Sequence, residues 1–325
     1  MSFDTFKKYS YGTKMQKIGL MFSGGGGKGA YEVGVWKALE ELNLASNVFA
    51  VSGTSVGALN AALFAQGDLR KAESAWLEMR PEDVLSFNAE NIVKSLLYAG
   101  IKLTYPMIRA IEVMAMTGVF SRDGLLRIIR GYLDNIEINK RVIPCYVCAA
   151  ELPNIQEKYF SLHDYQEEIV EDILLASSAI PFLFPRQTVN GKQYWDGFLV
   201  DNTPIKPLLD DGCDIIISVF LNRMEVLPKK DFNNCKIIPI YPQSDIKGAL
   251  NFTSSKDKMQ CGFEDAMKLL SPIVGLVEDN HNRRHCFLKI MAQDLYFQSE
   301  SELFEENKNS LIKTKYKLNK EMDKW

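Results

Sequence analysis

The sequence predicts an α/β fold in which a mostly parallel sheet is covered by helices on both faces. Two short apolar runs, 17–22 and 48–51, each end at glycine and lead into a segment with helical character. Short apolar strands that alternate with helices are typical of parallel βαβ units. The composition, 46% hydrophobic and 24% charged, is ordinary for a globular protein and excludes a disordered chain or a low-complexity polymer.

The first 65 residues carry this prediction. The run 17–22 predicts a strand that ends in Ser23 and four glycines. After Lys28, apolar residues recur on one face of a helix, at positions 31, 35, 38, 39 and 42. The run 48–51 predicts the second strand, which stops at Ser52-Gly53, and 56–64 has a helix-like composition. The order is therefore strand, glycine turn, helix, strand, sharp turn, helix.

The rest of the chain predicts one catalytic domain with two helical additions. Further strands are expected at 142–148, 157–160, 187–194 (a hairpin around Asn190-Gly191), 214–220 and 236–240. Residues 81–134 show no strand signal and predict a helical insertion. We expect a catalytic domain over 1–250 and a helical C-terminal extension over 251–325 packed on it. The last twenty residues, 306–325, form a basic tail with six Lys against three acidic residues.

Charge and cysteine content exclude several classes of protein. The net charge of −3 gives no general attraction to nucleic acid. Residues 1–17 are polar, so they predict no secretory signal, and nowhere do about 18 apolar residues run uninterrupted as a membrane span requires. The six cysteines are widely scattered, which is typical of reduced thiols in a cytoplasmic protein. The pair Cys145 and Cys148 lies in a predicted strand, which disfavours zinc or redox chemistry, and we expect no metal site.

The sequence Gly53-Thr54-Ser55-Val56-Gly57 has the G-x-S-x-G pattern of a nucleophile elbow. In such an elbow a strained strand-to-helix turn exposes the serine hydroxyl, and glycines remove side chains that would clash. The Val56 N–H then lies at a helix N-terminus, where it can donate to an oxyanion. The alternative is a tight turn with an inert serine. The position of the motif between an apolar strand and an apolar helix favours the elbow.

The glycine-rich loop Gly24-Gly25-Gly26-Gly27-Lys28-Gly29 also lies between a strand and a helix. Consecutive glycines leave backbone N–H groups uncovered, so the loop can bind an anion. A dinucleotide fold would need an acidic residue after the next strand, which ends in Ser52-Gly53 instead, and a phosphate-binding loop would need Ser or Thr after Gly-Lys. An oxyanion is the ligand that remains, because adjacent parallel strands bring this loop and Ser55 to the same sheet edge.

The serine needs a base, and the sequence leaves two kinds of candidate open. The three histidines are His163 beside a charged stretch, and His281 and His285 on a charged helical segment. All three positions favour solvated side chains over a catalytic triad. A carboxylate is the alternative, and Asp196 in Trp195-Asp196-Gly197 follows the predicted hairpin strand. Composition alone does not select it from 41 acidic residues.

Four motifs in order resemble the patatin-like phospholipase family, over about residues 17–250. The loop at 24–29 resembles the family's G-G-G-x-[K/R]-G, and 53–57 resembles its G-T-S-x-G. The segment Ala176-Ser177-Ser178-Ala179-Ile180-Pro181, followed by Phe184-Pro185, resembles the segment that precedes the base. The pair Asp196-Gly197, with Asn202 and Pro204 further on, resembles the dyad motif. Gly118-Val119-Phe120 with Leu125-Leu126 is similar to the stretch that follows the family's insertion.

The resemblance implies a three-layer α/β/α sandwich and a Ser55–Asp196 dyad that needs no histidine, metal or organic cofactor. Ser55 would attack an ester carbonyl, Asp196 would take its proton, and the amides of Gly25, Gly26 and Val56 would hold the oxyanion. The chain departs from the family at Phe198, where Gly or Ala is usual, so a bulky ring is expected to narrow the site or line an acyl channel.

The resulting functional expectation is a serine acyl-ester hydrolase that acts on phospholipid or lysophospholipid. The alternatives are an acyltransferase that uses the same acyl-enzyme, a catalytically silent lipid-binding protein, and, as a third, a dinucleotide-dependent oxidoreductase. We expect an acyl-lipid partner, no nucleic acid and a cytoplasmic location. The basic tail leaves two alternatives open, a solvated segment, which its composition favours, and a peripheral contact with an anionic membrane surface. Oligomeric state, head group and acyl position do not follow from the sequence.

Overall fold

A computed structural model of the chain describes residues 17–80, 86–87, 120–121, 123–133, 143–181, 183–223, 225, 235–244, 246 and 252–275. In this part of the chain, a mixed sheet of eight strands has the order β10-β9-β1-β2-β5-β8-β7, and β6 also pairs with β5. The parallel strands are β10 (Lys236–Ile240), β9 (Ile215–Val219), β1 (Ile18–Phe22), β2 (Val48–Thr54) and β5 (Cys145–Glu151). The antiparallel strands are β6 (Gln156–Ser161), β8 (Lys192–Asp196) and β7 (Gln187–Val189).

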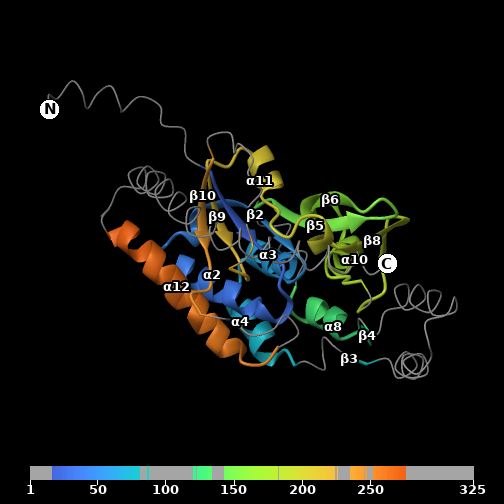
Figure 1. Cartoon of the computed structure of the whole chain (residues 1–325), viewed down its shortest axis with the longest axis horizontal. Coiled ribbons are helices and arrows are strands. Elements are labelled where there is room, and N and C mark those ends of the chain that lie inside the picture. Colours follow the sequence, from blue (N-terminus) through green and yellow to red (C-terminus); the bar gives the residue numbers. More distant parts are fainter. Residues whose placement is uncertain are drawn as a thin grey trace, which may run out of the picture.

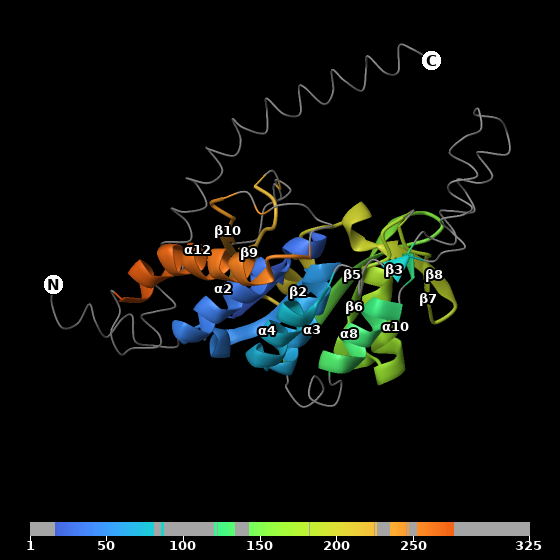
Figure 2. The same cartoon turned by 90° about the horizontal axis from the view of Figure 1, so that it is seen from below.

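Helices cover both faces of this sheet, so the predicted three-layer architecture is confirmed (Figures 1 and 2). Strand β1 shows why: Leu20 and Phe22 point into one core cluster and Met21 into another. The first face carries α2 (Ala30–Glu41), α3 (Val56–Gln66), α4 (Leu69–Glu78), α8 (Asp123–Tyr132) and α10 (Glu167–Ser177), and α12 (Ser255–Gly275) packs on α2. The second face carries α11 (Lys206–Asp210). Short 3-10 helices are η1 (Gly26–Lys28), η2 (Ala45–Asn47), η3 (Leu162–Asp164) and η4 (Gly197–Leu199).

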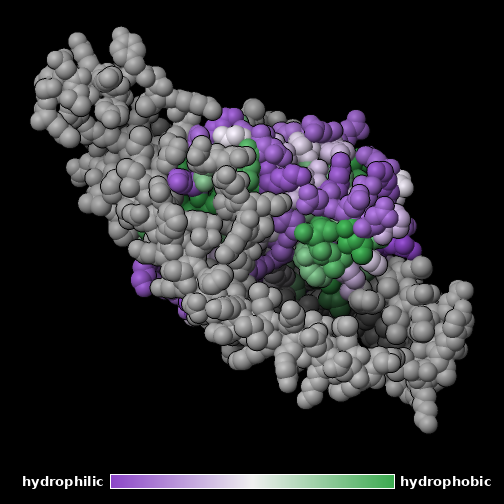
Figure 3. Space-filling view, turned by 45° about the horizontal axis from the view of Figure 1, so that its top comes forward, coloured by the Kyte–Doolittle hydropathy of each residue, from purple (hydrophilic) through white to green (hydrophobic). Residues whose placement is uncertain are grey.

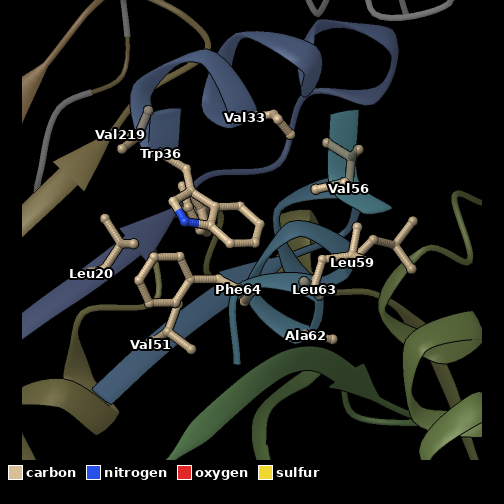
Figure 4. Close-up of a cluster of buried hydrophobic side chains, with 14 of the residues drawn as sticks. Leu20, Val33, Trp36, Val51, Val56, Leu59, Ala62, Leu63, Phe64 and Val219 are labelled. Atoms are coloured by element: carbon tan, nitrogen blue, oxygen red, sulfur yellow. The ribbon is translucent and has the colours of Figure 1, made fainter. Parts of the chain in front are cut away.

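The larger core cluster fixes α2 and α3 on the sheet. Trp36 of α2 and Phe64 of α3 meet over β1 and β2, with ring centroids 5.0 Å apart (Figure 4). Both rings are fully buried, and burying an aromatic side chain contributes roughly 1.5–3 kcal/mol. Because α3 begins at Val56, inside the Gly53–Gly57 turn, this packing also fixes the position of that turn.

Most strand and helix predictions are confirmed. The 187–194 hairpin forms as β7 and β8, and Asn190 and Gly191 adopt the positive φ angles, 48° and 78°, that a two-residue hairpin turn requires. The expectation of no strand between 81 and 134 is wrong, because β3 (Ser86–Phe87) pairs antiparallel with β4 (Phe120–Ser121). Only two residues of each strand pair, too few for an alternating pattern to appear in the sequence.

Several predicted features lie outside the described residues: the segment 88–118, His281 and His285, and the basic tail 306–325. The proposed domain boundary near 250 stays a prediction. Within the described residues, none of the helices has both the length and the apolar character needed to cross a bilayer.

Candidate active site

The turn between β2 and α3 holds Ser55 in a strained backbone conformation. Its φ of 56° and ψ of −122° lie where residues with a side chain rarely occur. The turn is tight enough that a Cβ at Gly53 would lie 2.1 Å from the Gly57 carbonyl oxygen. A Cβ at Gly57 would in turn lie 2.5 Å from the carbonyl oxygen of Phe22 on β1. The elbow geometry predicted from residues 53–57 is therefore present.

Ser55 faces Asp196, which ends strand β8. The Ser55 hydroxyl donates a hydrogen bond to Asp196 Oδ2 over 2.7 Å. The other carboxyl oxygen, Oδ1, accepts the N–H of Phe198 at 2.9 Å, so both oxygens are fixed. The next residue, Gly197, packs directly on β5, since a Cβ there would lie 2.5 Å from the Cys148 carbonyl oxygen. The two residues of the predicted dyad, 141 positions apart in the chain, are in direct contact.

Asp196 has the environment of a base rather than that of an ordinary surface carboxylate. Its side chain is fully buried. Burial raises the pKa of the Asp196 carboxyl to about 7, although the hydrogen bonds from Phe198 and Ser55 favour the ionised form. A base is most effective when its pKa lies near the working pH, and Asp196 meets that condition.

A relay of hydrogen bonds ties the elbow to β5. The N–H of Ser55 donates to the Ser177 hydroxyl at 2.8 Å, and that hydroxyl donates to the Cys148 carbonyl at 2.6 Å. Ser177 is fully buried at the end of α10. The Ser177 hydroxyl therefore accepts the Ser55 N–H. The next N–H, that of Val56, is the first of helix α3 and lies at its N-terminus.

The glycine loop lies beside the elbow, because β1 and β2 are parallel neighbours. Gly26 has a φ of 56°, which favours glycine at this position. Within the described residues, the N–H groups of Gly25 and Gly26 donate no hydrogen bond, whereas those of Lys28 and Gly29 close the short helix η1 on Gly25 and Gly26 carbonyls. Two uncommitted amides next to a serine hydroxyl are what an oxyanion site requires.

Side chains from distant segments hold this loop. Asn202 exchanges two hydrogen bonds with Gly24: its backbone carbonyl accepts the Gly24 N–H at 3.2 Å, and its amide donates to the Gly24 carbonyl at 3.1 Å. The Lys28 ammonium donates to the Leu221 carbonyl at 3.3 Å. Gly29 packs against Trp76, where a Cβ would lie 2.6 Å from the indole ring.

Beneath the loop lies a buried polar cluster formed by Glu32, Asn60 and Trp76. The Asn60 amide donates to the Gly29 carbonyl at 2.9 Å and to Glu32 at 2.7 Å, and it accepts the Trp76 indole N–H at 2.9 Å. Burial raises the pKa of the Glu32 carboxyl well above its usual range. This cluster connects the start of α2 to α3 and α4, so it fixes the loop relative to Ser55.

The dyad and the loop open into one cavity of about 640 Å³. One wall is apolar and comes from α3, α8 and the segment between α10 and β7, where Leu59, Leu125, Ile180, Leu183 and Phe184 line it. The lining also includes polar side chains that follow β8 and β9, namely Asn202, Asn222 and Glu225. A surface view shows an apolar area bordered by polar residues beside a hollow (Figure 3).

Most predicted site residues meet at this cavity, lined by Gly24, Gly25, Gly26, Lys28, Ser55, Val56 and Asp196. Gly27, Gly29, Gly53, Gly57 and Gly197 support it from outside. Phe198 lines the cavity but is 45% exposed, so its ring lies at the cavity's solvent boundary. His163 lies in η3, and the Ser55 hydroxyl binds Asp196 instead. Sequence reasoning missed Glu225, whose pKa burial raises to about 7. No motif marks this residue.

The comparisons with known proteins show the family of this chain. Residues 20–209, more than half of the chain, match the model of the patatin-like phospholipase family. The chain belongs to that family. It is 24% identical over 220 residues to an uncharacterized NTE family protein of Mycobacterium bovis. The aligned region covers 68% of this chain and 53% of the relative. It is also 28% identical over 221 residues to lysophospholipase NTE1 of Cryptococcus neoformans. That aligned region covers 67% of this chain and 12% of the relative.

Among solved structures, VipD from Legionella pneumophila is similar with a TM-score of 0.43 and 16% identity, over 80% of this chain and 67% of that one. The chain spans about half the length of its mycobacterial relative, 53%, and a much smaller part of the fungal one.

Proposed function

We propose that this member of the patatin-like phospholipase family is a serine hydrolase of fatty-acyl esters in phospholipid or lysophospholipid. The observation that carries the proposal is the 2.7 Å hydrogen bond from Ser55 to a buried Asp196, at a cavity with a long apolar wall. The lysophospholipase name of the fungal relative supports a lipid substrate. No step of the proposed reaction uses a metal or cofactor.

In the proposed mechanism, Asp196 accepts the Ser55 proton as Oγ bonds to the ester carbonyl carbon. The negative charge that develops on the carbonyl oxygen is held by the N–H groups of Gly25, Gly26 and Val56. The alcohol leaves with the proton from Asp196, and an acyl group remains on Ser55. A water molecule then attacks the acyl-enzyme and gives a proton to Asp196, and collapse of the second intermediate returns that proton to Ser55 as the fatty acid leaves.

The two walls of the cavity orient the substrate. The strand order places β9 on one side of the β1–β2 centre and β5 and β8 on the other. Asn222 and Glu225 follow β9, whereas Ile180, Leu183 and Phe184 of the apolar lining follow α10, which packs on β5 and β8. The acyl chain is proposed to lie along the apolar wall, and the alcohol part of the ester to lie toward Glu225.

The test compares wild type, Ser55→Ala and Asp196→Asn on a short-chain ester and on lysophospholipid micelles. Each variant should lose at least about 10³-fold in kcat while keeping its fold, as removal of a nucleophile or its base does elsewhere. A variant with His163, His281 and His285 all replaced should stay within about threefold of wild type. Loss of activity in that variant would show that a histidine, and not Asp196, is the base.

The acyltransferase alternative uses the same acyl-enzyme and differs in what attacks it. Mass spectrometry of products formed with an added alcohol or lysolipid acceptor separates the two. The hydrolase proposal requires free fatty acid as the main product at every acceptor concentration.

A further inference from the structure

The C-terminal helix α12 places a buried lysine against the glycine loop. Lys258 lies in the first turn of α12 and is only 5% exposed. Its ammonium group donates a hydrogen bond to the Gly27 carbonyl at 2.8 Å. Lysine is almost never buried without a compensating partner, because its charge is costly to remove from water. The Gly27 carbonyl is one of the groups that compensate for the burial of the Lys258 ammonium.

The Gly27 carbonyl lies in the middle of the loop that carries the two uncommitted amides. Gly27 belongs to η1, and the N–H groups of Gly25 and Gly26 precede it directly. Two further carbonyls of the loop accept hydrogen bonds from side chains outside it: Gly24 from Asn202, and Gly29 from Asn60. Lys258 of α12 binds the Gly27 carbonyl, which lies between Gly24 and Gly29 in the loop.

The packing of α12 on α2 positions Lys258 within narrow limits. A Cβ at Gly34 would lie 1.9 Å from the Met259 carbonyl oxygen, and one at Gly262 would lie 2.0 Å from the Tyr31 carbonyl oxygen. The helices thus meet backbone to backbone at Met259 and Gly262, within the turn that follows Lys258. The Tyr31 hydroxyl also donates to Asp265 at 3.0 Å. This register leaves the lysine little freedom along or around the helix axis.

The electrostatics of the site fit the same role. Burial lowers the pKa of Lys258, and the nearby Lys28 charge lowers it further. Two ammonium groups therefore lie close to the loop at which the proposed reaction develops negative charge. Positive charge close to this loop stabilises negative charge that forms there in the transition state.

We propose that Lys258 is a positioning residue, which holds the Gly27 carbonyl so that the Gly25 and Gly26 amides point at the oxyanion. This inference rests on the proposed hydrolase function. It also makes the site depend on a helix beyond residues 20–209, the part that matches the family.

The test uses Lys258→Met, which keeps the aliphatic stem and removes the ammonium, with Lys256→Met as the matched control. Lys256 lies on the same helix and is exposed. Both variants are assayed with a soluble ester and with a trifluoromethyl ketone, which forms a tetrahedral adduct with serine. We expect Lys258→Met to lower kcat by about 10- to 100-fold, less than loss of an oxyanion donor itself, with KM nearly unchanged. Affinity for the ketone should fall by the same factor, and Lys256→Met should match wild type.

A Lys258→Met enzyme that melts earlier but keeps wild-type kcat and ketone affinity would overturn the proposal, because the lysine would then only support the fold. Should this variant not fold, Lys258→Gln replaces it, since a glutamine amide is polar but ends one bond short of Gly27. The same fall in kcat is expected, and wild-type kcat in the folded Gln variant would overturn the proposal. Failure of the proposed function looks different, because wild type itself would then neither hydrolyse esters nor bind the ketone.

Discussion

At the scale of single residues, Asp196 combines complete burial with two hydrogen bonds to its carboxyl group. Burial disfavours the charged form and raises the pKa to about 7, so the proton affinity of the group is far above that of a surface aspartate. Under the proposed mechanism, only the ionised form can accept the Ser55 proton. The buried carboxylate that the proposed mechanism uses as its base is therefore also a source of instability at neutral pH.

The first prediction is a rise of activity with pH. We expect kcat/KM for an uncharged ester to increase and level off with an inflection near pH 7, because the free enzyme becomes competent as Asp196 ionises. The competing source of such an inflection is Glu225, whose pKa burial also raises to about 7. A pH profile of Glu225→Gln separates them: the inflection should persist, and its disappearance would assign the titration to Glu225.

The second prediction concerns stability. The Asp196 pKa is raised on folding from 3.8 to about 7, so the unfolded chain loses this proton at lower pH than the native protein does. Wild-type stability should consequently fall between about pH 4 and pH 7, whereas Asp196→Asn has no such proton to lose. The Asn variant should melt at about the wild-type temperature near pH 4 and several degrees higher at pH 8. Thermal melts of both proteins across this range check it, and parallel curves would contradict the raised pKa.

At the scale of elements, the close contact between α2 and α12 depends on glycine, which has no side chain, at Gly34 and Gly262. Gly262→Ala places a methyl group 2.0 Å from the Tyr31 carbonyl oxygen, so the helices must separate. We expect a loss of at least about 2 kcal/mol in the free energy of unfolding, as overpacking elsewhere costs. Gly131 of α8 is the control, since nothing lies within 4 Å of its Cβ position and alanine there should stabilise the helix by about 0.5–1 kcal/mol. Chemical denaturation of both variants measures the difference, and equal stabilities would contradict close packing of α12.

The apolar wall gives a prediction about acyl chains. Ile180 lines the cavity from the segment between α10 and β7. Ile180→Trp should fill part of the proposed acyl path, so kcat/KM for long-chain esters should fall by at least about tenfold relative to short-chain esters. Leu77→Trp is the control, because Leu77 is 56% exposed on α4 and outside the cavity lining. An equal effect on short and long chains would place the acyl chain elsewhere.

The elements also show what the sequence could reveal. The elbow and the glycine loop are local: glycine spacing and flanking apolar runs specify them, and both form as predicted. Asp196 needed the family resemblance, because nothing local distinguishes it from other acidic residues. Glu225 and Lys258 could not be predicted, since their roles come from packing between segments far apart, 231 positions for the Lys258–Gly27 contact. The β3–β4 pair was missed because two residues per strand carry no periodicity.

At the scale of the whole molecule, residues from widely separated parts of the described chain meet at one edge of the sheet and form the site. Strands β1 and β2 lead into the glycine loop and Ser55, β8 ends at Asp196, the segment after β9 contributes Glu225, and α12 contributes Lys258. Parallel strands make this convergence possible, because their carboxyl ends share one edge. The match to the family model ends at residue 209, so Asn222, Glu225 and Lys258 lie beyond the matched part of the chain.

The central claim is that Ser55, activated by Asp196, is a nucleophile, and covalent labelling tests it most directly. Wild type, Ser55→Ala and Asp196→Asn would each be treated with a fluorophosphonate, and the intact mass and labelled peptide measured. We predict one adduct per wild-type chain, on Ser55, with none on Ser55→Ala and a strongly slowed reaction of Asp196→Asn. A folded wild type that stays unlabelled, or carries its adduct on another residue, would contradict the claim.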